Sequence, residues 1–224
     1  MKHFEYYIDE SLQEIASRAI RCKQDILLLL AYTVKAIVEQ ELSKNIRFTQ
    51  PENKNYRLQV HVDRMNRLVY CMDKKIFSYQ MPFDIYEADD GGMIIKYNHE
   101  WVIDSYLSSV LITVFGDVDC FDGTIEDIYY RVDNRIKNIY NTDGLGEDVI
   151  WKLLKDLMLY EPGYIRCDDD PDPNRMNPDT HPRYHLDINY ESSATYKIGL
   201  QRMITPEEML SILDNGQKRA TLYI

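Results

Sequence analysis

The sequence predicts an α+β fold with a long N-terminal helical segment, an antiparallel β meander, a central helical block and a C-terminal β-hairpin plus helix. Three observations lead to this prediction. The spacing of apolar residues changes along the chain from helical to alternating and back, and Gly, Pro, Asn and Asp gather where it changes. Of the 224 residues, 45% are hydrophobic and 28% are charged, which is typical of folded globular proteins. The first choice is a single domain over residues 1–224, with lobes at 1–100 and 101–224 as the alternative.

The N-terminal helical segment is predicted over about residues 9 to 44, where apolar residues recur at helical spacing without Pro or Gly. It forms either one long helix or two consecutive helices. Its longest apolar run, residues 26 to 32, is flanked by charged residues and is shorter than the roughly 20 residues that span a bilayer. We therefore expect a buried helix and no membrane segment. The acidic start of the chain lacks the pattern of an export signal, which predicts a cytoplasmic protein.

The β meander follows a break at residues 49–55 that contains proline and asparagine. Three short runs rich in β-forming residues, YRLQVHVD, RLVYCMD and KKIFSYQM, are joined by polar stretches. They predict three antiparallel strands. The run MIIKYN, after a turn at residues 87–92, is a candidate for a fourth strand.

The central helical block is predicted at residues 101–115, 124–140 and 147–160, because each segment carries an apolar stripe at helical spacing. Breaks that contain Gly and Asp separate the three segments. Thr124 is expected to cap the middle helix, whose first turn holds acidic residues that complement the helix dipole.

The last quarter of the chain returns to β structure. A strand at 164–167 leads into a long polar loop, and residues 184–190 and 195–200 are predicted to form a hairpin. The sequence TPEEMLSIL then predicts a helix that begins with a capping box between Thr205 and Glu208.

The predicted hairpin carries the candidate site. If Leu186 and Ile188 face the core, then His185, Asp187 and Asn189 face the other side of the strand. The polar loop before the hairpin would bring further ligands, namely His181 and Asp168. Two histidines and one or two aspartates suit a divalent metal that activates water, and Lys197 on the next strand could then neutralise developing charge.

Two structural alternatives to this site stay open. The polar residues could simply form the solvent-facing side of a sheet. Arg166, in the strand before the loop, could form a buried ion pair with Asp187 across the sheet.

The acidic loop DDDPDPN at residues 168–174 is a second candidate, since clustered carboxylates can bind calcium or magnesium. It lacks the glycine and the closing glutamate of an EF-hand loop. Prolines interrupt its four carboxylates, and we therefore expect a solvated, extended loop.

Composition limits the classes of function. The sequence contains no glycine-rich nucleotide loop, no H-E-x-x-H motif and no G-x-S-x-G motif. The net charge of −11, from 37 acidic and 26 basic residues, disfavours autonomous nucleic-acid binding. The four cysteines are widely spaced, which predicts reduced thiols and no zinc site. The 18 tyrosines favour a surface that binds another protein.

The C-terminal quarter resembles a group of uncharacterised bacterial proteins. The resemblance rests on Y-I-R-C-D-D-D, on H-P-R-Y-H-L-D-I-N, on Y-K-I-G-L and on a T-P-x-x helix, and covers about 50 of the 224 residues. In that pattern the position of Asp187 varies, and an arginine precedes the closing strand where this chain has Lys197. The resemblance implies a bacterial, cytoplasmic accessory protein of a mobile or defence-related gene cluster, and it implies no chemistry.

These observations lead to three hypotheses. The first is a non-enzymatic protein-binding or regulatory subunit of a bacterial multi-protein system, with no cofactor. The second is a metal-dependent hydrolase or nuclease, a toxin-like effector, with His185, Asp187 and Lys197 in catalysis and a divalent metal held by those His and Asp side chains together with His181 and Asp168. The third is an acidic mimic of nucleic acid, which would need carboxylates in a phosphate-like array, whereas lysines and arginines are intermixed with them. The sequence leaves the oligomeric state open.

Overall fold

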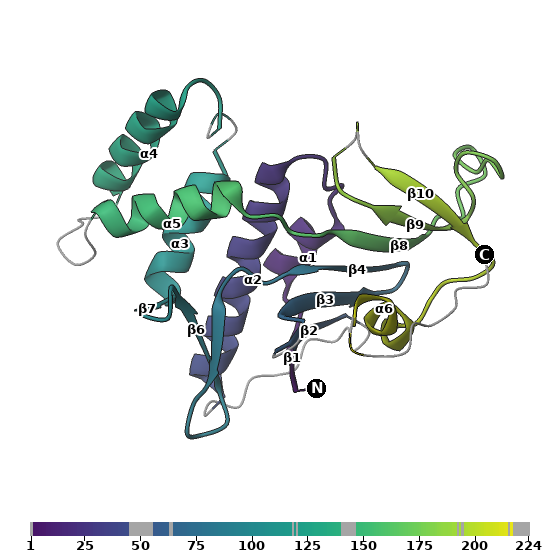
Figure 1. The fold of residues 1–224 in the computed structure, drawn as a ribbon, viewed down its shortest axis with the longest axis horizontal. Coiled ribbons are helices and arrows are strands. Elements are labelled where there is room, and N and C mark those ends of the chain that lie inside the picture. The colour runs from purple at the N-terminus through teal and green to yellow at the C-terminus, as the bar shows by residue number, and fades with distance from the viewer. Residues whose placement is uncertain are drawn as a thin grey trace. The chain divides into compact units, whose positions relative to one another are not determined.

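The computed structural model of the chain shows two compact units (Figure 1). The first consists of residues 1–8, 49–81 and 161–224, and the second of residues 9–48 and 82–160. The structure describes residues 2–44, 56–62, 65–117, 119, 121–139, 147–191, 193, 195–214 and 216.

The first unit contains a seven-stranded antiparallel sheet in the order β1-β2-β3-β4-β8-β9-β10. The predicted meander and C-terminal hairpin are confirmed, and β4 pairs with β8, so both β segments belong to one sheet. The N-terminal strand, which pairs with β2, was not predicted. The strands are β1 (His3–Tyr7), β2 (Arg57–His61), β3 (Arg67–Met72), β4 (Lys75–Gln80), β8 (Ile165–Asp169), β9 (Tyr184–Ile188) and β10 (Tyr196–Leu200).

One face of this sheet packs into a hydrophobic core. Alternation along β8 and β9 directs Cys167 and Leu186 into a buried cluster with Met209 of α6 (Pro206–Leu213). The predicted capping box is present, because the Thr205 side chain accepts from the Glu208 amide at 3.2 Å and Glu208 accepts from the Thr205 amide at 2.8 Å. The capping box thus sets the start of α6, and the apolar side of this helix packs on the core of the sheet.

The polar residues that alternate with the core residues along β8 and β9 point to the other face of the sheet, as was predicted for β9.

The two apolar residues of β9 differ in burial. Leu186 is 2% exposed and lies in the core, but Ile188 is 38% exposed. Both residues lie on the core side of β9, since Ile188 pairs with Ile165, but only Leu186 is buried in the core. Ile188 is the last residue of β9, and Asn189 after it takes a φ of 72°, which turns the chain away.

The second unit combines helices with a three-stranded antiparallel sheet. The N-terminal helical segment is two helices, because Asp25 accepts from the amides of Arg21 and Cys22 and so begins a new helix after a short break. The run MIIKYN does form a strand, but it belongs to this smaller sheet, β5-β6-β7. The elements are α1 (Glu10–Ser17), α2 (Lys23–Ser43), β5 (Asp84–Glu87), β6 (Met93–Tyr97), β7 (Trp101–Val102), α3 (Ser105–Phe115), α4 (Ile125–Ile139) and α5 (Glu147–Leu159).

The helix predicted at residues 101–115 begins later than expected. Trp101 pairs with Tyr97 of β6, and Asp104 caps the helix by accepting from the Leu107 amide at 2.8 Å. The two following helices are confirmed, and Thr124 accepts from the Asp127 amide at the start of α4.

Two predictions concern the whole chain. Within the part that the structure describes, no helix has the length and apolar character needed to cross a membrane. Cys22, Cys71 and Cys167 are free thiols, and Cys120 lies outside the described residues.

Candidate functional sites

The pairing of three neighbouring strands brings five charged or titratable side chains together. Arg166 and Asp168 of β8 lie opposite Asp187 and His185 of β9, and Lys197 of β10 lies opposite Asp187. All five alternate with core residues and so share the second face of the sheet. We call these five residues the polar cluster.

Ion pairs connect the members of the polar cluster. Asp187 accepts from Arg166 Nη2 through Oδ2 and from Lys197 Nζ at 2.6 Å through Oδ1. Arg166 Nε also donates to Asp168 Oδ2 at 2.7 Å. The predicted ion pair between Arg166 and Asp187 is therefore confirmed. With two carboxylates and two cations, the polar cluster is electrically neutral when His185 is neutral.

His185 has one ring nitrogen bonded and one that is not. Its Nδ1 lies 2.8 Å from the carbonyl oxygen of Pro182, which can only accept, so Nδ1 carries the proton. Its Nε2 is buried and has no hydrogen-bond partner among the described residues. This nitrogen points between two carboxylates, at 3.7 Å from Asp168 Oδ2 and 3.9 Å from Asp187 Oδ1.

Burial shifts the pKa values around the polar cluster. It lowers the pKa of His185, partly offset by the Pro182 carbonyl, and thus favours the neutral ring. Burial also lowers the pKa of Arg166, but Tyr164, Asp168 and Asp187 outweigh it and leave the pKa above its ordinary value. Lys75, which lies opposite Asp168 on β4, has a pKa lowered to about 8 by burial and by Arg166.

Burial decides what this arrangement can do. His185 is 1% and Asp187 3% exposed, so a large substrate has no direct access to either side chain in this structure. A bare ion needs far less room than a substrate. The polar cluster can thus hold the strands together and bind a small cation, with His185, Asp168 and Asp187 as the residues able to ligate it.

Two predicted contributors lie next to the polar cluster rather than in it. The His181 ring lies beside the His185 ring, with centroids 4.7 Å apart and the rings tilted, but its Nε2 lies 3.1 Å from Asp170 Oδ2. Asn189 lies beyond the end of β9, and its side chain accepts from the Tyr190 amide.

The carboxylates of the acidic loop do not converge on one point. Asp168 and Asp169 belong to β8, which extends further than predicted. Asp169 pairs with Arg183 at 2.7 Å, and Asp170 pairs with His181 and with Arg175. Separate basic partners thus neutralise Asp169 and Asp170.

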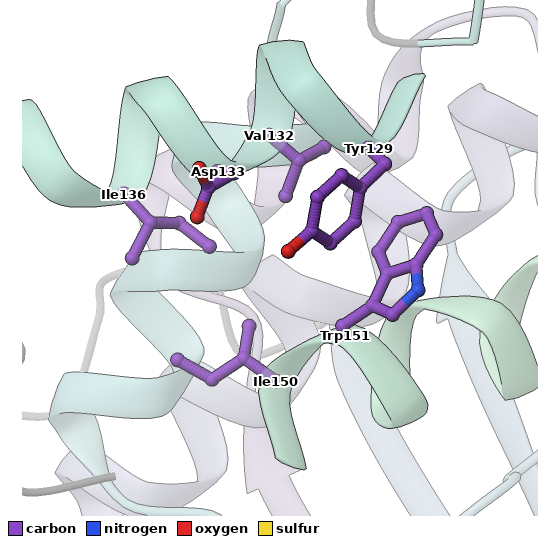
Figure 2. A pocket seen from close by; sticks show the side chains of 6 residues that line it. All are labelled: Tyr129, Val132, Asp133, Ile136, Ile150 and Trp151. Carbon is purple, nitrogen blue, oxygen red and sulfur yellow. The ribbon is translucent and has the colours of Figure 1, made fainter. Parts of the chain in front are cut away.

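A second candidate site, not predicted from the sequence, lies between two helices of the second unit. Figure 2 shows side chains of α4 and α5 around a small hollow, with the Tyr129 ring beside the Trp151 indole. The two ring centroids are 5.0 Å apart in an edge-to-face arrangement. The hollow is lined by Tyr129, Val132, Asp133, Ile136, Ile150 and Trp151.

The mouth of this hollow extends into an exposed aromatic surface. Ile125 is 49% and Tyr130 64% exposed, and both line a second, more open depression with Tyr129 and Trp151. Glu126 and Lys155 complete its rim. We call this surface, with the hollow, the aromatic groove.

The helical spacing in α4 would have predicted an exposed tyrosine at the aromatic groove. Ile128, Val132 and Ile136 recur every four residues and form the buried stripe of α4. The adjacent Tyr129 and Tyr130 cannot both follow that stripe, because successive helical residues are about 100° apart. At least one of them had to face outward.

Comparison with protein-family models, with curated proteins and with solved structures finds nothing that matches this chain.

Proposed function

We propose that the protein is a non-enzymatic binding subunit that docks a basic segment of a partner protein in the aromatic groove. The observation that carries the proposal is the exposed apolar and aromatic surface around Tyr129, Tyr130 and Trp151. Tyr and Trp supply large, rigid contact areas and are enriched among the residues that dominate binding energy at interfaces.

The chemistry of the occupant follows from the shape and charge of the groove. The hollow is small and mostly apolar and adjoins the wider, open depression, which suits the end of an aliphatic side chain of the partner as an anchor. Glu126 and Asp133 line the groove, Lys155 lies on its rim and Lys137 pairs with Asp133 at 3.0 Å, so the preference for a basic occupant comes from the net charge of −11 of the whole chain. A segment with Lys or Arg beside the anchor is thus favoured over an acidic one, and an arginine could also stack on the exposed rings.

The burial of the polar cluster also favours a binding subunit over a hydrolase. A hydrolase acting on a macromolecule needs catalytic groups that its substrate can reach, whereas His185 and Asp187 are almost fully covered. The expectation of a bacterial, defence-related multi-protein system, from the C-terminal resemblance, stands as the proposed setting of this partner.

Site-specific photocrosslinking in a bacterial host tests the proposal. A photoreactive phenylalanine analogue replaces Tyr130, which is 64% exposed, and in a matched control it replaces Glu14, an exposed residue of α1. We expect a crosslinked protein at position 130 only, and a basic stretch in its crosslinked peptide. Crosslinking at both positions, or to an acidic segment, would contradict the proposal.

Binding of the purified crosslinked partner then gives the quantitative test. Tyr130→Ala should weaken binding by at least about tenfold while the melting temperature stays constant, because Tyr130 is exposed and contributes little to the core. Glu14→Ala should leave binding unchanged. Equal affinity of Tyr130→Ala and the wild type would overturn the proposed location.

A further inference from the structure

We infer that Asp168, His185 and Asp187 form a binding site for one divalent first-row transition metal ion, with Lys197 as its competitor for Asp187. This site is separate from the aromatic groove and does not depend on the proposed function. The argument starts from the histidine, since two carboxylates alone would also be explained by their ion pairs.

The unpaired nitrogen of His185 is the main evidence. Buried polar atoms nearly always find a hydrogen-bond partner, and each exception needs a cause. Nε2 of this 1% exposed residue has no partner among the described residues, although two carboxylate oxygens lie 3.7 and 3.9 Å away. With the proton held on Nδ1 by Pro182, Nε2 faces those oxygens as a lone pair, which repels them and attracts a cation.

The distances suit a metal ion between the three atoms. In zinc sites the metal lies about 2.0 to 2.2 Å from nitrogen and oxygen ligands, so two ligand atoms at a tetrahedral angle are about 3.4 Å apart. The three candidate ligand atoms lie within 4.8 Å of one another, and the two histidine distances exceed the ideal by only a few tenths of an ångström.

The surroundings of the ligands resemble those of established metal sites. A ligating histidine usually donates its other N–H to a carbonyl or carboxylate, as His185 does to Pro182. Arg166 holds Asp168 and Asp187 in place through its own hydrogen bonds. An imidazole ligand favours zinc, cobalt, nickel or copper over magnesium and calcium, which prefer oxygen.

Lys197 has the properties of a competitor. Its ammonium lies 2.6 Å from Asp187 Oδ1, the oxygen nearest to His185, and so places positive charge beside the site. Its side chain is 30% exposed and can turn toward water, whereas Arg166 is 17% exposed. A bound ion would therefore displace Lys197 and leave Arg166 in place.

The test uses the full chain, stripped with a chelator and titrated with Co²⁺ and Zn²⁺. We expect one ion per chain, a visible Co²⁺ absorption band from nitrogen and oxygen ligands, and a higher melting temperature with metal. Excess Mg²⁺ should not compete. Absence of binding at submillimolar Co²⁺ and Zn²⁺, or displacement by Mg²⁺, would overturn the inference.

Variants assign the ligands. His185→Phe should abolish binding, while His61→Phe, at the other buried histidine with an unpaired ring nitrogen, should bind as the wild type does. Asp168→Asn keeps an acceptor for Arg166 and should weaken binding at least tenfold, which secures the test if His185→Phe does not fold.

The Lys197→Met variant tests the competition for Asp187. It should tighten binding about tenfold, since it removes a positive charge from the site. Unchanged affinity in Asp168→Asn would refute the ligand set, and weaker affinity in Lys197→Met would refute the competition.

Discussion

Asp187 receives hydrogen bonds from Arg166 and Lys197 while only 3% of its surface is exposed. A buried charge depends on its partners, because removing one leaves the other uncompensated in a medium that solvates it poorly. The two cations differ in this respect, since Lys197 is the more exposed of them.

Asp187→Ala should therefore lower the free energy of unfolding by about 3 kcal/mol, since it leaves Arg166 with Asp168 alone and removes the carboxylate that pairs with Lys197. Lys197→Met should cost less than about 1 kcal/mol, because the lysine is partly solvated. Urea denaturation at neutral pH measures both. The double variant Arg166→Met with Asp187→Leu should cost less than Asp187→Ala alone, and a larger loss would contradict this account.

His61 on β2 predicts a pH dependence of stability. Burial, followed by repulsion from His3, lowers its pKa from 6.5 to about 4 in the folded chain. Between those two values the unfolded chain binds a proton that the folded chain does not, so stability falls as the pH falls through this window. Above about pH 6.5 His61 is neutral in both the folded and the unfolded chain, and the cost disappears.

In urea denaturation series, the wild type should lose about 2 kcal/mol more than His61→Phe between roughly pH 7 and pH 4. Phenylalanine keeps the ring next to His3 and cannot titrate. Parallel stability curves for the two proteins would show that His61 takes up its proton without cost in the folded state.

At the residue scale, the pairing of Arg166 with Asp187 was one of the alternatives that the sequence left open, and the structure shows that the ion pair is formed. The sequence did not predict that His185 would be buried with a bare Nε2, since burial depends on contacts distant in sequence. The place of Lys75 beside Asp168 was missed for the same reason, because β4 and β8 are far apart along the chain.

At the scale of elements, the hairpin of β9 and β10 offers a test of register. Leu186 lies in the core and Ile188 is 38% exposed at the strand end, although the two are one strand repeat apart. Leu186→Ala should cost about 3 kcal/mol of unfolding free energy, and Ile188→Ala less than about 1 kcal/mol. Chemical denaturation of the two variants measures both losses, and equal losses would mean that Ile188 is buried as deeply as Leu186.

The capping box of α6 yields a second prediction at this scale. Thr205→Ala removes the acceptor for the Glu208 amide and should lower the free energy of unfolding by about 1 kcal/mol. Thr205→Ser keeps the hydroxyl and should stay near the wild type. Denaturation curves for both variants check the expectation, and a loss in the serine variant equal to that in alanine would contradict it.

Elements with strong local signals were predictable, and those that depend on distant partners were not. The apolar stripes, the Thr124 cap of α4 and the capping box of α6 predicted α4, α5 and α6 to within a few residues. The edge strand β1 is only five residues long and takes its pairing from β2, some 50 residues later. Likewise, Trp101 and Val102 were predicted to begin a helix, because no feature of the neighbouring sequence indicates that they pair with β6.

At the scale of the whole molecule, the net charge of −11 governs association with the proposed basic partner. Long-range attraction raises the association rate at low salt and is screened at high salt. The association rate constant should fall about tenfold between roughly 0.05 and 0.5 M NaCl, whereas the dissociation rate should change little. Stopped-flow mixing with the purified partner measures both, and an association rate independent of salt would point to an uncharged partner segment.

The seven-stranded sheet is built from three separate stretches of chain, and this order has a consequence for folding during synthesis. Strand β4 can pair with β3 once both have left the ribosome, but its other edge pairs with β8, which follows only after residues 82–160. Until then β4 presents Ile76 and Phe77 on an open edge, the kind of edge that recruits other chains. The nascent protein thus has an interval in which the second edge of β4 is unpaired, and slowing translation after residue 160 should increase aggregation.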